Sequence, residues 1–339
     1  MSTSLNPFVF VSRVLRIDYV CDRTSPKLLH WIPIEELEWR LLCHNPNAIP
    51  LLEKFPEKIN WDYLSSNPNA IHLLEKNLDK VNWDYLSENT NVIPLLEKNL
   101  DKINWTYLSD NPNAIHLLEK NLDKVDWFRL SRNPNAIHIL ERFPEKIKWK
   151  YLSQNPNAIH LVEKNMDKID CIDWIYLSSN PNAIHLLERF PERINWYYLS
   201  KNPNAIPILE KNLDKINWIC LSSIPNAIHL LEQNMDEIYW EELSLNPNAI
   251  PIMEKNQDKI NWRFLCRNPN AIPLLEKNQD KINWDTISLN PSIFEFNQER
   301  SIERTNIIRE ELMQIVMHPR RIQRMMELMG DEFDVDMSF

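Results

Sequence analysis

Glycine is almost absent from this sequence of 339 residues, in which Gly330 is the only one. Phosphate-binding loops, dinucleotide-binding turns and nucleophile elbows need glycine where the backbone approaches a ligand or takes a positive φ angle. The composition therefore argues against most nucleotide-dependent enzymes. Positive charge is also in deficit, because the formal net charge is −10. Sequence-independent nucleic-acid binding depends on clustered Lys and Arg, so a general phosphate-binding surface is not expected.

Cysteines and long apolar runs are also few. The five cysteines are an odd number, and two of them, Cys43 and Cys266, replace a serine of a repeated segment, so a disulfide framework is not expected. The apolar run of residues 8–11 is too short for a signal-peptide core, and no stretch is long enough to cross a membrane. These features predict an intracellular protein with reduced thiols and no membrane partner.

A segment close to "NPNAIHLLEKN" recurs along the chain. Tryptophan marks the period, with every gap equal to 22 residues except one of 25, at positions 39, 61, 83, 105, 127, 149, 174, 196, 218, 240, 262 and 284. Counted from each Asn-Pro, eleven units cover 45–289. A fixed period of this length indicates a solenoid or a propeller.

Each unit contains two short apolar clusters. Ala70, Ile71 and Leu74 have the i, i+3, i+4 spacing of a helix, and the β-branched alternation of propeller strands is missing. The prediction is an all-α fold, an α-solenoid of eleven two-helix repeats of about 22 residues with capping segments at both ends. Packed at roughly 8–10 Å, the units would form a superhelical array on the order of 100 Å long.

Helix boundaries follow from the sixth position of the unit, which holds His in six units and Pro in five. Proline costs little only in the first turn of a helix, so this position is predicted to lie there. The Asn of the third position, such as Asn69, would then be the N-cap of a first helix over 70–77, with Asn77 as a left-handed end. The second helix would begin at Trp after an Asn or Asp cap, as in Asn60-Trp61. The connector between the helices has two versions, Asn-x-Asp and Phe-Pro-Glu.

The two ends depart from the repeat. Residues 27–44 resemble a degenerate unit, as terminal capping units do, so 1–44 are interpreted as an N-terminal cap. Residues 290–339 are interpreted as a C-terminal helical cap with two apolar stripes, a Met- and Arg-rich second helix and an acidic tail. A three-residue insertion within 168–174 is expected to bulge one connector. The bulge is either a contact loop or sequence drift without a function, and drift is favoured.

No residue cluster predicts catalysis, a cofactor or a metal. Consecutive units would hold their histidines roughly 8–10 Å apart, too far for ligands of one zinc ion, so a plain surface position is favoured. Glu75 and Asp79 are four residues apart, but the same pair recurs, whereas an acid/base couple occurs once. A non-enzyme without a small-molecule site is expected.

Two aromatic series remain. Tryptophan is present in every unit, which favours a buried packing seam over base stacking. The second residue after each Trp, here called the tyrosine row, is either a half-buried helix flank or a partner-binding face. The candidate face comprises Tyr63, Tyr85, Tyr107, Arg129, Tyr151, Tyr176, Tyr198 and Phe264. The residue directly after Trp, the variable slot, would flank this face with Asp62, Asp84, Thr106, Phe128, Lys150, Ile175, Tyr197, Ile219, Glu241, Arg263 and Asp285.

Tandem units of the form N-P-N-A-I-x-L-L-E-K-N-x-D-K-I-N-W-x-x-L-S resemble repeat proteins of giant and other large nucleocytoplasmic DNA viruses, over roughly residues 27–330. This resemblance implies a viral protein in the host cytoplasm or the virion that acts as a scaffold. We therefore expect protein–protein interaction along an elongated face. The alternative is modular nucleic-acid binding with Tyr stacking, which the few positive charges of the early units disfavour.

Overall fold

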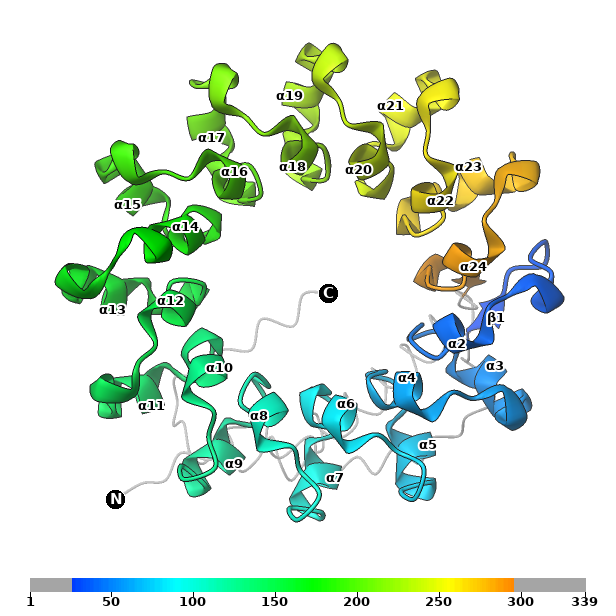
Figure 1. Cartoon of the computed structure of the whole chain (residues 1–339). Coiled ribbons are helices and arrows are strands. Elements are labelled where there is room, and N and C mark those ends of the chain that lie inside the picture. Colours follow the sequence, from blue (N-terminus) through cyan, green and yellow to red (C-terminus); the bar gives the residue numbers. More distant parts are fainter. Residues whose placement is uncertain (1–25, 296–339) are drawn as a thin grey trace, which may run out of the picture. The chain divides into compact units, whose positions relative to one another are not determined.

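The computed structural model describes residues 26–295. Within them, Leu28–Phe294 form one compact unit, a closed ring built almost entirely from helices (Figure 1). Residues 1–25 and the C-terminal helices expected beyond 295 lie outside the described residues. The predicted all-α array of two-helix repeats is confirmed.

The second helix of each unit lies on the inner side of the ring and begins at Trp, except α14, which begins at Cys171 (Figure 1). Neighbouring inner helices contact one another around the ring. These inner helices are α2 (Trp39–Leu42), α4 (Trp61–Ser65), α6 (Trp83–Glu88), α8 (Trp105–Leu108), α10 (Trp127–Arg132), α12 (Trp149–Leu152), α14 (Cys171–Ser179), α16 (Trp196–Leu199), α18 (Trp218–Ser222), α20 (Trp240–Leu245), α22 (Trp262–Leu265) and α24 (Trp284–Ile287).

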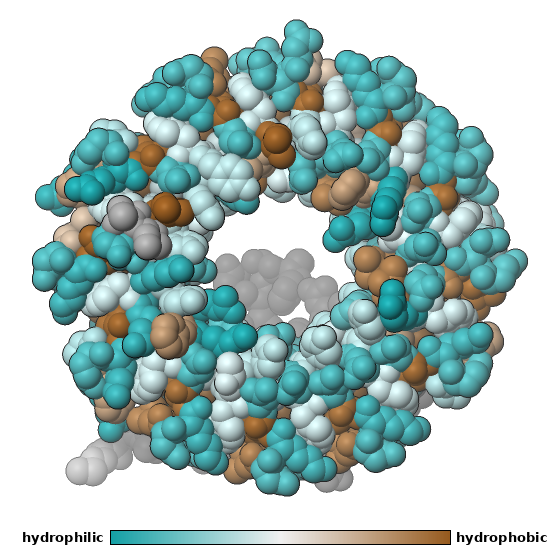
Figure 2. All heavy atoms as spheres, in the orientation of Figure 1, coloured by the Kyte–Doolittle hydropathy of each residue, from teal (hydrophilic) through white to brown (hydrophobic). Residues whose placement is uncertain are grey.

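The first helix of each unit lies outside the inner helices, and space-filling atoms of the unit leave a central opening (Figure 2). The outer helices are α3 (Ile49–Lys54), α5 (Ile71–Lys76), α7 (Ile93–Glu97), α9 (Ile115–Lys120), α11 (Ile137–Arg142), α13 (Ile159–Lys164), α15 (Ile184–Arg189), α17 (Ile206–Leu209), α19 (Ile228–Gln233), α21 (Ile250–Lys255) and α23 (Ile272–Glu276).

Short 3₁₀ turns and two strands complete the described unit. Turns in the connectors are η2 (Pro56–Lys58), η3 (Pro144–Lys146), η5 (Met166–Lys168), η6 (Pro191–Arg193), η8 (Leu213–Lys215), η10 (Met235–Glu237), η11 (Gln257–Lys259) and η13 (Gln279–Lys281). Turns at the Asn-Pro segments are η4 (Pro156–Ala158), η7 (Pro203–Ala205), η9 (Pro225–Ala227), η12 (Pro269–Ala271) and η14 (Pro291–Ile293), and η1 (Ile34–Glu36) belongs to the degenerate unit. The strands β1 (Lys27–Leu28) and β2 (Phe294–Glu295) pair with each other.

The core of each unit consists of small and branched side chains. Leu108, Ala114 and Leu118 are completely buried, and the same positions are buried in the other units. A fully buried leucine contributes roughly 1.5–3 kcal/mol relative to an exposed one. Because helices of four to six residues do not persist alone, this packing between units is what makes the helices form.

The first-helix boundaries differ from the prediction. Proline of the sixth position does lie in the first turn, but the N-cap position is Ala70, which has no side-chain cap. Asn69 is not the cap, because its amide donates to Asn67 Oδ1 (3.0 Å) and its own Nδ2 donates to Pro46 O (2.9 Å) in the preceding unit. The expected left-handed end is also wrong: Asn77 has φ −135°, and its Nδ2 donates to Leu73 O (2.9 Å).

Caps of the second helices match the prediction except in α14, where Asp173 before Trp174 lies inside the helix and its amide donates to Asp170 Oδ1. Asn60 Oδ1 accepts from the amide of Tyr63 (3.2 Å), and the helix begins at Trp61. In the next unit, the amide of the capping residue Asn82 donates to Ser65 Oγ (2.9 Å) of the unit before it. The cap therefore fixes both the start of an inner helix and its register on its neighbour.

A ladder of buried asparagines joins successive units. Asn111 is 1% exposed, and its Nδ2 donates to Ser87 O (3.1 Å) and Asn89 O (3.1 Å) of the preceding unit. Its Oδ1 accepts from the amide of Asn113 (3.0 Å). Within the described array, equivalent pairs of bonds are made by Asn67, Asn89, Asn133, Asn155, Asn180, Asn202, Asn246, Asn268 and Asn290, with Ile224 as the exception.

Histidines of the sixth position are also contacts between units, and not the plain surface residues that the sequence predicts. Each Nε2 lies 2.6–3.2 Å from a glutamate Oε1 of the preceding outer helix. The pairs are His72–Glu53, His116–Glu97, His138–Glu119, His160–Glu141, His185–Glu163 and His229–Glu210. Exposed pairs of this kind contribute about 0–1 kcal/mol, which agrees with proline replacing His in five units.

The tryptophans pack against the core, but in the described units all except Trp174, which is 5% exposed, are only partly buried. Two versions of the connector cover them. In the Asn-x-Asp version, a lysine of the next unit lies over the ring, as Lys80 Nζ does at 5.1 Å from the Trp61 centroid. In the Phe-Pro-Glu version, the contact with the Trp ring comes from Phe, as in the edge-on contact of Trp39 with Phe55 at 5.2 Å. The tryptophan seam is therefore confirmed as packing, at the edge of the core.

The two ends of the array meet. Asn45 Nδ2 donates to Ser288 O (3.0 Å) and Asn290 O (2.9 Å), as a ladder asparagine does. Asn47 Nδ2 donates to Pro291 O (2.9 Å), and the amide of Glu38 donates to Ser288 Oγ (2.9 Å). The degenerate unit, through Glu38, and the first full unit, through Asn45 and Asn47, thus make the regular contacts of a repeat with the end of the array. The described array closes on itself, whereas the sequence predicts an elongated superhelical array.

The three-residue insertion does not bulge a connector. It extends an inner helix, so that α14 has nine residues where its neighbours have four to six. The amide of Asp170 donates to Asp173 Oδ2 (2.8 Å), and the amide of Asp173 donates to Asp170 Oδ1 (3.0 Å). The extra turn is therefore closed by a reciprocal pair of aspartates.

Asp173 makes stability at this turn depend on pH. It is 4% exposed, and burial, followed by the charge of Asp170, raises its pKa above the ordinary value of 3.8. The folded state then holds the proton more tightly than the unfolded state, so stability falls as pH rises from 3.8 through the folded pKa. Asp173→Asn keeps the acceptor and removes the charge. We expect a higher melting temperature than wild type at pH 7, with the difference shrinking towards pH 4, in thermal scans by circular dichroism.

The exposed Asp167→Asn is the matched control, because it removes a carboxylate from the same segment without burial. A gain at pH 7 that is equal for both variants would contradict the role of burial.

Candidate partner-binding surface

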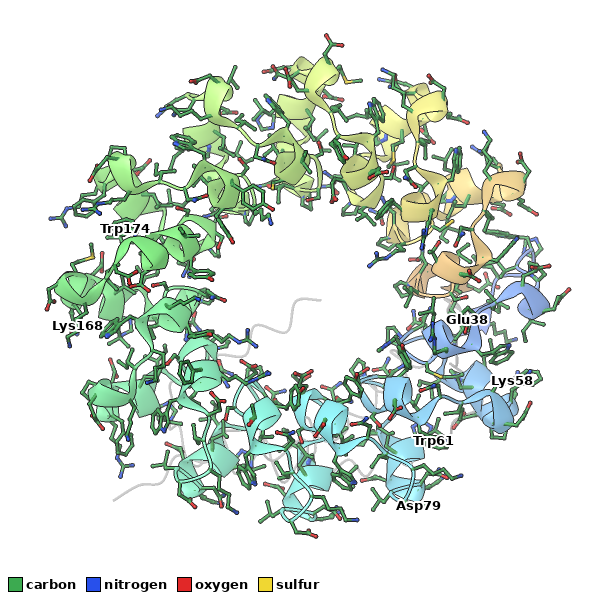
Figure 3. All side chains as sticks on the ribbon, viewed as in Figure 1. Glu38, Lys58, Trp61, Asp79, Lys168 and Trp174 are labelled. Atoms are coloured by element: carbon green, nitrogen blue, oxygen red, sulfur yellow. The ribbon has the colours of Figure 1, made fainter. Side chains whose placement is uncertain are left out.

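The inner helices present three positions away from the core. Leu and Ser, three and four residues after each Trp, are buried in the described units except where Ile or Cys takes their place, and these replacements are buried as well. The variable slot, the tyrosine row and the residue after the serine position therefore face away from the core, towards the central opening. Connector residues lie on the opposite side: Lys58, Asp79 and Lys168 are at the outer rim (Figure 3).

Capping positions the tyrosine row. The capping side chain accepts from the amide of the row residue, as Asn60 does from Tyr63 (3.2 Å) and Asn195 from Tyr198 (3.1 Å). Most row residues are half-buried, whereas Tyr85 is 48% exposed and Cys220 is buried. This exposure agrees with both interpretations of the row, the half-buried helix flank and the partner-binding face, because a half-buried side chain still presents an edge to the opening.

Four consecutive inner helices, α10, α12, α14 and α16, bring aromatic and basic side chains together. The Phe128 and Tyr151 ring centroids are 5.6 Å apart, and those of Tyr176 and Tyr198 are 6.1 Å apart. Lys150 Nζ lies between units, 5.8 Å from the Tyr151 centroid and 5.5 Å from that of Tyr176. We call this region, with its neighbours, the aromatic–basic arc: Tyr107, Phe128, Arg129, Lys150, Tyr151, Tyr176, Tyr197, Tyr198 and Lys201.

Basic side chains also contact aromatic rings at the two ends of the arc. The Arg129 guanidinium lies 4.6 Å from the Tyr107 centroid, and its Nη1 is 2.6 Å from Asp110 Oδ2. At the other end, Lys201 Nζ lies 4.4 Å from the Tyr197 centroid and donates to Tyr197 Oη (3.1 Å). This hydrogen bond raises the pKa of Lys201, so the side chain stays cationic.

Charge is segregated along the inner surface. The three inward positions hold seven basic residues, Arg40, Arg129, Arg132, Lys150, Lys201, Arg263 and Arg267. They also hold seven acidic ones, Asp62, Asp84, Glu88, Asp110, Glu241, Glu242 and Asp285. On the four helices of the arc, the only carboxylate is that of the buried Asp173. The arc is therefore a basic sector of a surface that is neutral as a whole.

Of the candidate residues from the sequence, the structure gathers Tyr107, Arg129, Tyr151, Tyr176 and Tyr198 into the arc. The other three lie on helices outside it: Tyr63 on α4, next to Arg40 and His44, Tyr85 on α6 and Phe264 on α22. Sequence reasoning missed Lys201, which follows the serine position. The sequence does contain a signal for it, because the residue after the serine position varies between units as much as the variable slot does.

Comparisons with known proteins add no relative: no family model, no curated protein and no solved structure matches the chain. Among the described residues, no helix has the length and apolar character needed to span a membrane.

Proposed function

We propose that this chain is a non-enzymatic scaffold that binds another protein on the inner surface of its ring. The observation that carries the proposal is that, within each unit, the residues that hold the array together are different from the residues that face the central opening. The polar residues that recur in nearly every unit, such as the ladder asparagines and the capping residues, are engaged in bonds between and within units. The residues that vary face the opening, where a partner would meet them.

Surface composition supports a protein partner. Tyrosine and arginine are the residue types that dominate binding energy at protein interfaces, and both are present in the arc. Basic residues with aromatics also suit single-stranded nucleic acid, which is the second candidate. The equal number of acidic side chains on the same inward positions disfavours a polyphosphate that follows the ring. Following the viral resemblance, we place the scaffold in the host cytoplasm or the virion.

A capture experiment with matched variants tests the proposal. The immobilised full-length protein is incubated with lysate of its source cells, with and without nuclease. Binding should survive nuclease and be lost in a triple variant, Tyr151→Ala, Tyr176→Ala and Tyr198→Ala. The control replaces His72, His116 and His138 on outer helices by the proline that other units carry, and it should capture the same proteins. Capture that disappears with nuclease, or that the inner variant retains, would refute the proposal.

A further inference from the structure

We infer that the aromatic–basic arc binds an extended acidic peptide segment of the partner, one that alternates carboxylates with aromatic or aliphatic side chains. This inference rests on the proposed function and adds the place and the chemistry of recognition. Three features carry it: two lysines that form no salt bridge among the described residues, the exposed rings and the spacing of the inner helices.

The lysines of the arc supply the cations. Within the described part of the chain, Lys150 lies against two tyrosine rings and Lys201 against two more, with a hydroxyl as hydrogen-bond partner. Arg129 and Arg132 differ, because they share Asp110 and are partly neutralised by it. Lys150 and Lys201 form no salt bridge among the described residues, although Lys150 lies near enough to Asp173 to act on its pKa, so a carboxylate from outside can pair with both lysines.

Exposed aromatic rings supply the apolar contacts. Phe128 is 51% exposed and Tyr197 is 48% exposed. On the next inner helix, Ile219 is 48% exposed and extends the apolar edge. Aromatic side chains bury large areas at interfaces with little loss of rotamer entropy. A partner with acidic residues alone would leave these rings in water, so the matching segment also carries apolar side chains.

Spacing favours an extended chain. Lys150 and Lys201 occupy different positions of inner helices two units apart. The contacts Lys150–Tyr176 (5.5 Å), Tyr176–Tyr198 (6.1 Å) and Tyr198–Lys201 (5.7 Å) join them, so their ammonium groups lie at most about 17 Å apart. An extended strand advances about 3.3 Å per residue. Carboxylates about five residues apart would therefore reach both lysines, and a segment of about 12 residues would cover the arc, whose adjacent helices are roughly 8–10 Å apart.

Acidic residues on either side of the arc favour a peptide over nucleic acid. Asp84 and Glu88 precede it along the ring, and Glu241 and Glu242 follow it. A phosphate at every nucleotide would meet these carboxylates as soon as the strand leaves the arc. A peptide can place its carboxylates at the two lysines alone.

Fluorescence anisotropy with the full-length protein tests the inference. The probe is a labelled peptide of about 12 residues in which Glu recurs at the inferred spacing among Phe, Leu and Ser. Comparison probes are the same peptide with Lys for Glu, and single-stranded DNA of equal length. At low salt we expect binding of the acidic probe, with at least about tenfold weaker binding by Lys150→Glu with Lys201→Glu.

Matched variants separate charge from folding. Lys164→Glu with Lys211→Glu makes the same change at exposed positions beside outer helices and should bind as wild type, as should Lys150→Arg with Lys201→Arg. Should the reversed variant misfold by circular dichroism, Lys150→Gln with Lys201→Gln replaces it. Equal binding by the charge-altered and wild-type proteins, equal binding of the Lys probe, or tighter binding of DNA overturns the inference. If capture of the partner depends on the tyrosines but persists in these lysine variants, the acidic-peptide inference is overturned and the proposed scaffold function is retained.

Discussion

Replacing Asn111 with alanine is expected to lower the free energy of unfolding by about 3–5 kcal/mol, because three backbone groups, two of them in buried bonds, lose their partners at once. The side chain donates to Ser87 O and Asn89 O and accepts from the amide of Asn113. It is 1% exposed, so water does not take its place. Urea titration followed by tryptophan fluorescence measures the effect.

Asn121→Ala is the matched control for this prediction. Asn121 ends the outer helix of the same unit, and its Nδ2 donates to Leu117 O (2.9 Å) within that unit. One partly buried bond is worth about 0.5–1.5 kcal/mol, so the control should cost much less. Equal losses for the two variants would show that the ladder bonds between units are not what stabilises the array.

Ile224 shows how the array tolerates a gap in the ladder. At this junction Asn226 Nδ2 still donates to Pro203 O (2.6 Å), and His229 still pairs with Glu210 (2.6 Å). The isoleucine also packs against the core. A natural substitution that fills the space is thus compatible with the ring, whereas alanine at Asn111 would leave the space empty.

Much of the unit could be predicted from its sequence, because those signals are local. A period of 22 residues and helical spacing identify the two-helix repeat, and capping chemistry locates the second helix at Trp61. The prediction that the second asparagine of the Asn-Pro-Asn segment caps the next helix was wrong, because it considered only neighbours in the sequence. Asn67 and Asn69 in fact donate to carbonyls of the preceding unit, such as Asn45 O and Pro46 O, and that register is a tertiary property.

The closure of the array into a ring could not be predicted either, because it also depends on contacts between units. The curvature of a repeat array is the sum of small rotations between units, and no single unit reveals it. The only local traces are at the ends, where Asn45 and Asn47 keep the repeat pattern and Ser288 and Asn290 match it. For the candidate surface, variation pointed to the inner positions, but the gathering of rings and lysines on α10–α16 depends on how neighbouring helices stack.

The closed ring leads to a second large expectation, for Asn45→Ala. In an open array this residue would lose its bonds to Ser288 O and Asn290 O and keep only the bond from the Asn47 amide (3.0 Å), so its replacement would cost about 0.5–1.5 kcal/mol. In the ring, Asn45 makes the bonds of an interior ladder asparagine to Ser288 O and Asn290 O and is 1% exposed. We therefore expect Asn45→Ala to lower the free energy of unfolding by about 3–5 kcal/mol, as Asn111→Ala does.

The shape of the molecule separates this outcome from a general loss of stability. Each unit of a repeat array contacts only its neighbours, so weakening the junction between the first and last units lets the ring open while every other junction stays intact. Small-angle X-ray scattering of the full-length Asn45→Ala and Asn47→Ala double variant should give a larger radius of gyration than wild type, with helical circular dichroism retained. Asn47 is included because its bond to Pro291 O also crosses this junction. An unchanged radius together with an unchanged unfolding midpoint would mean that the ends are not joined in solution.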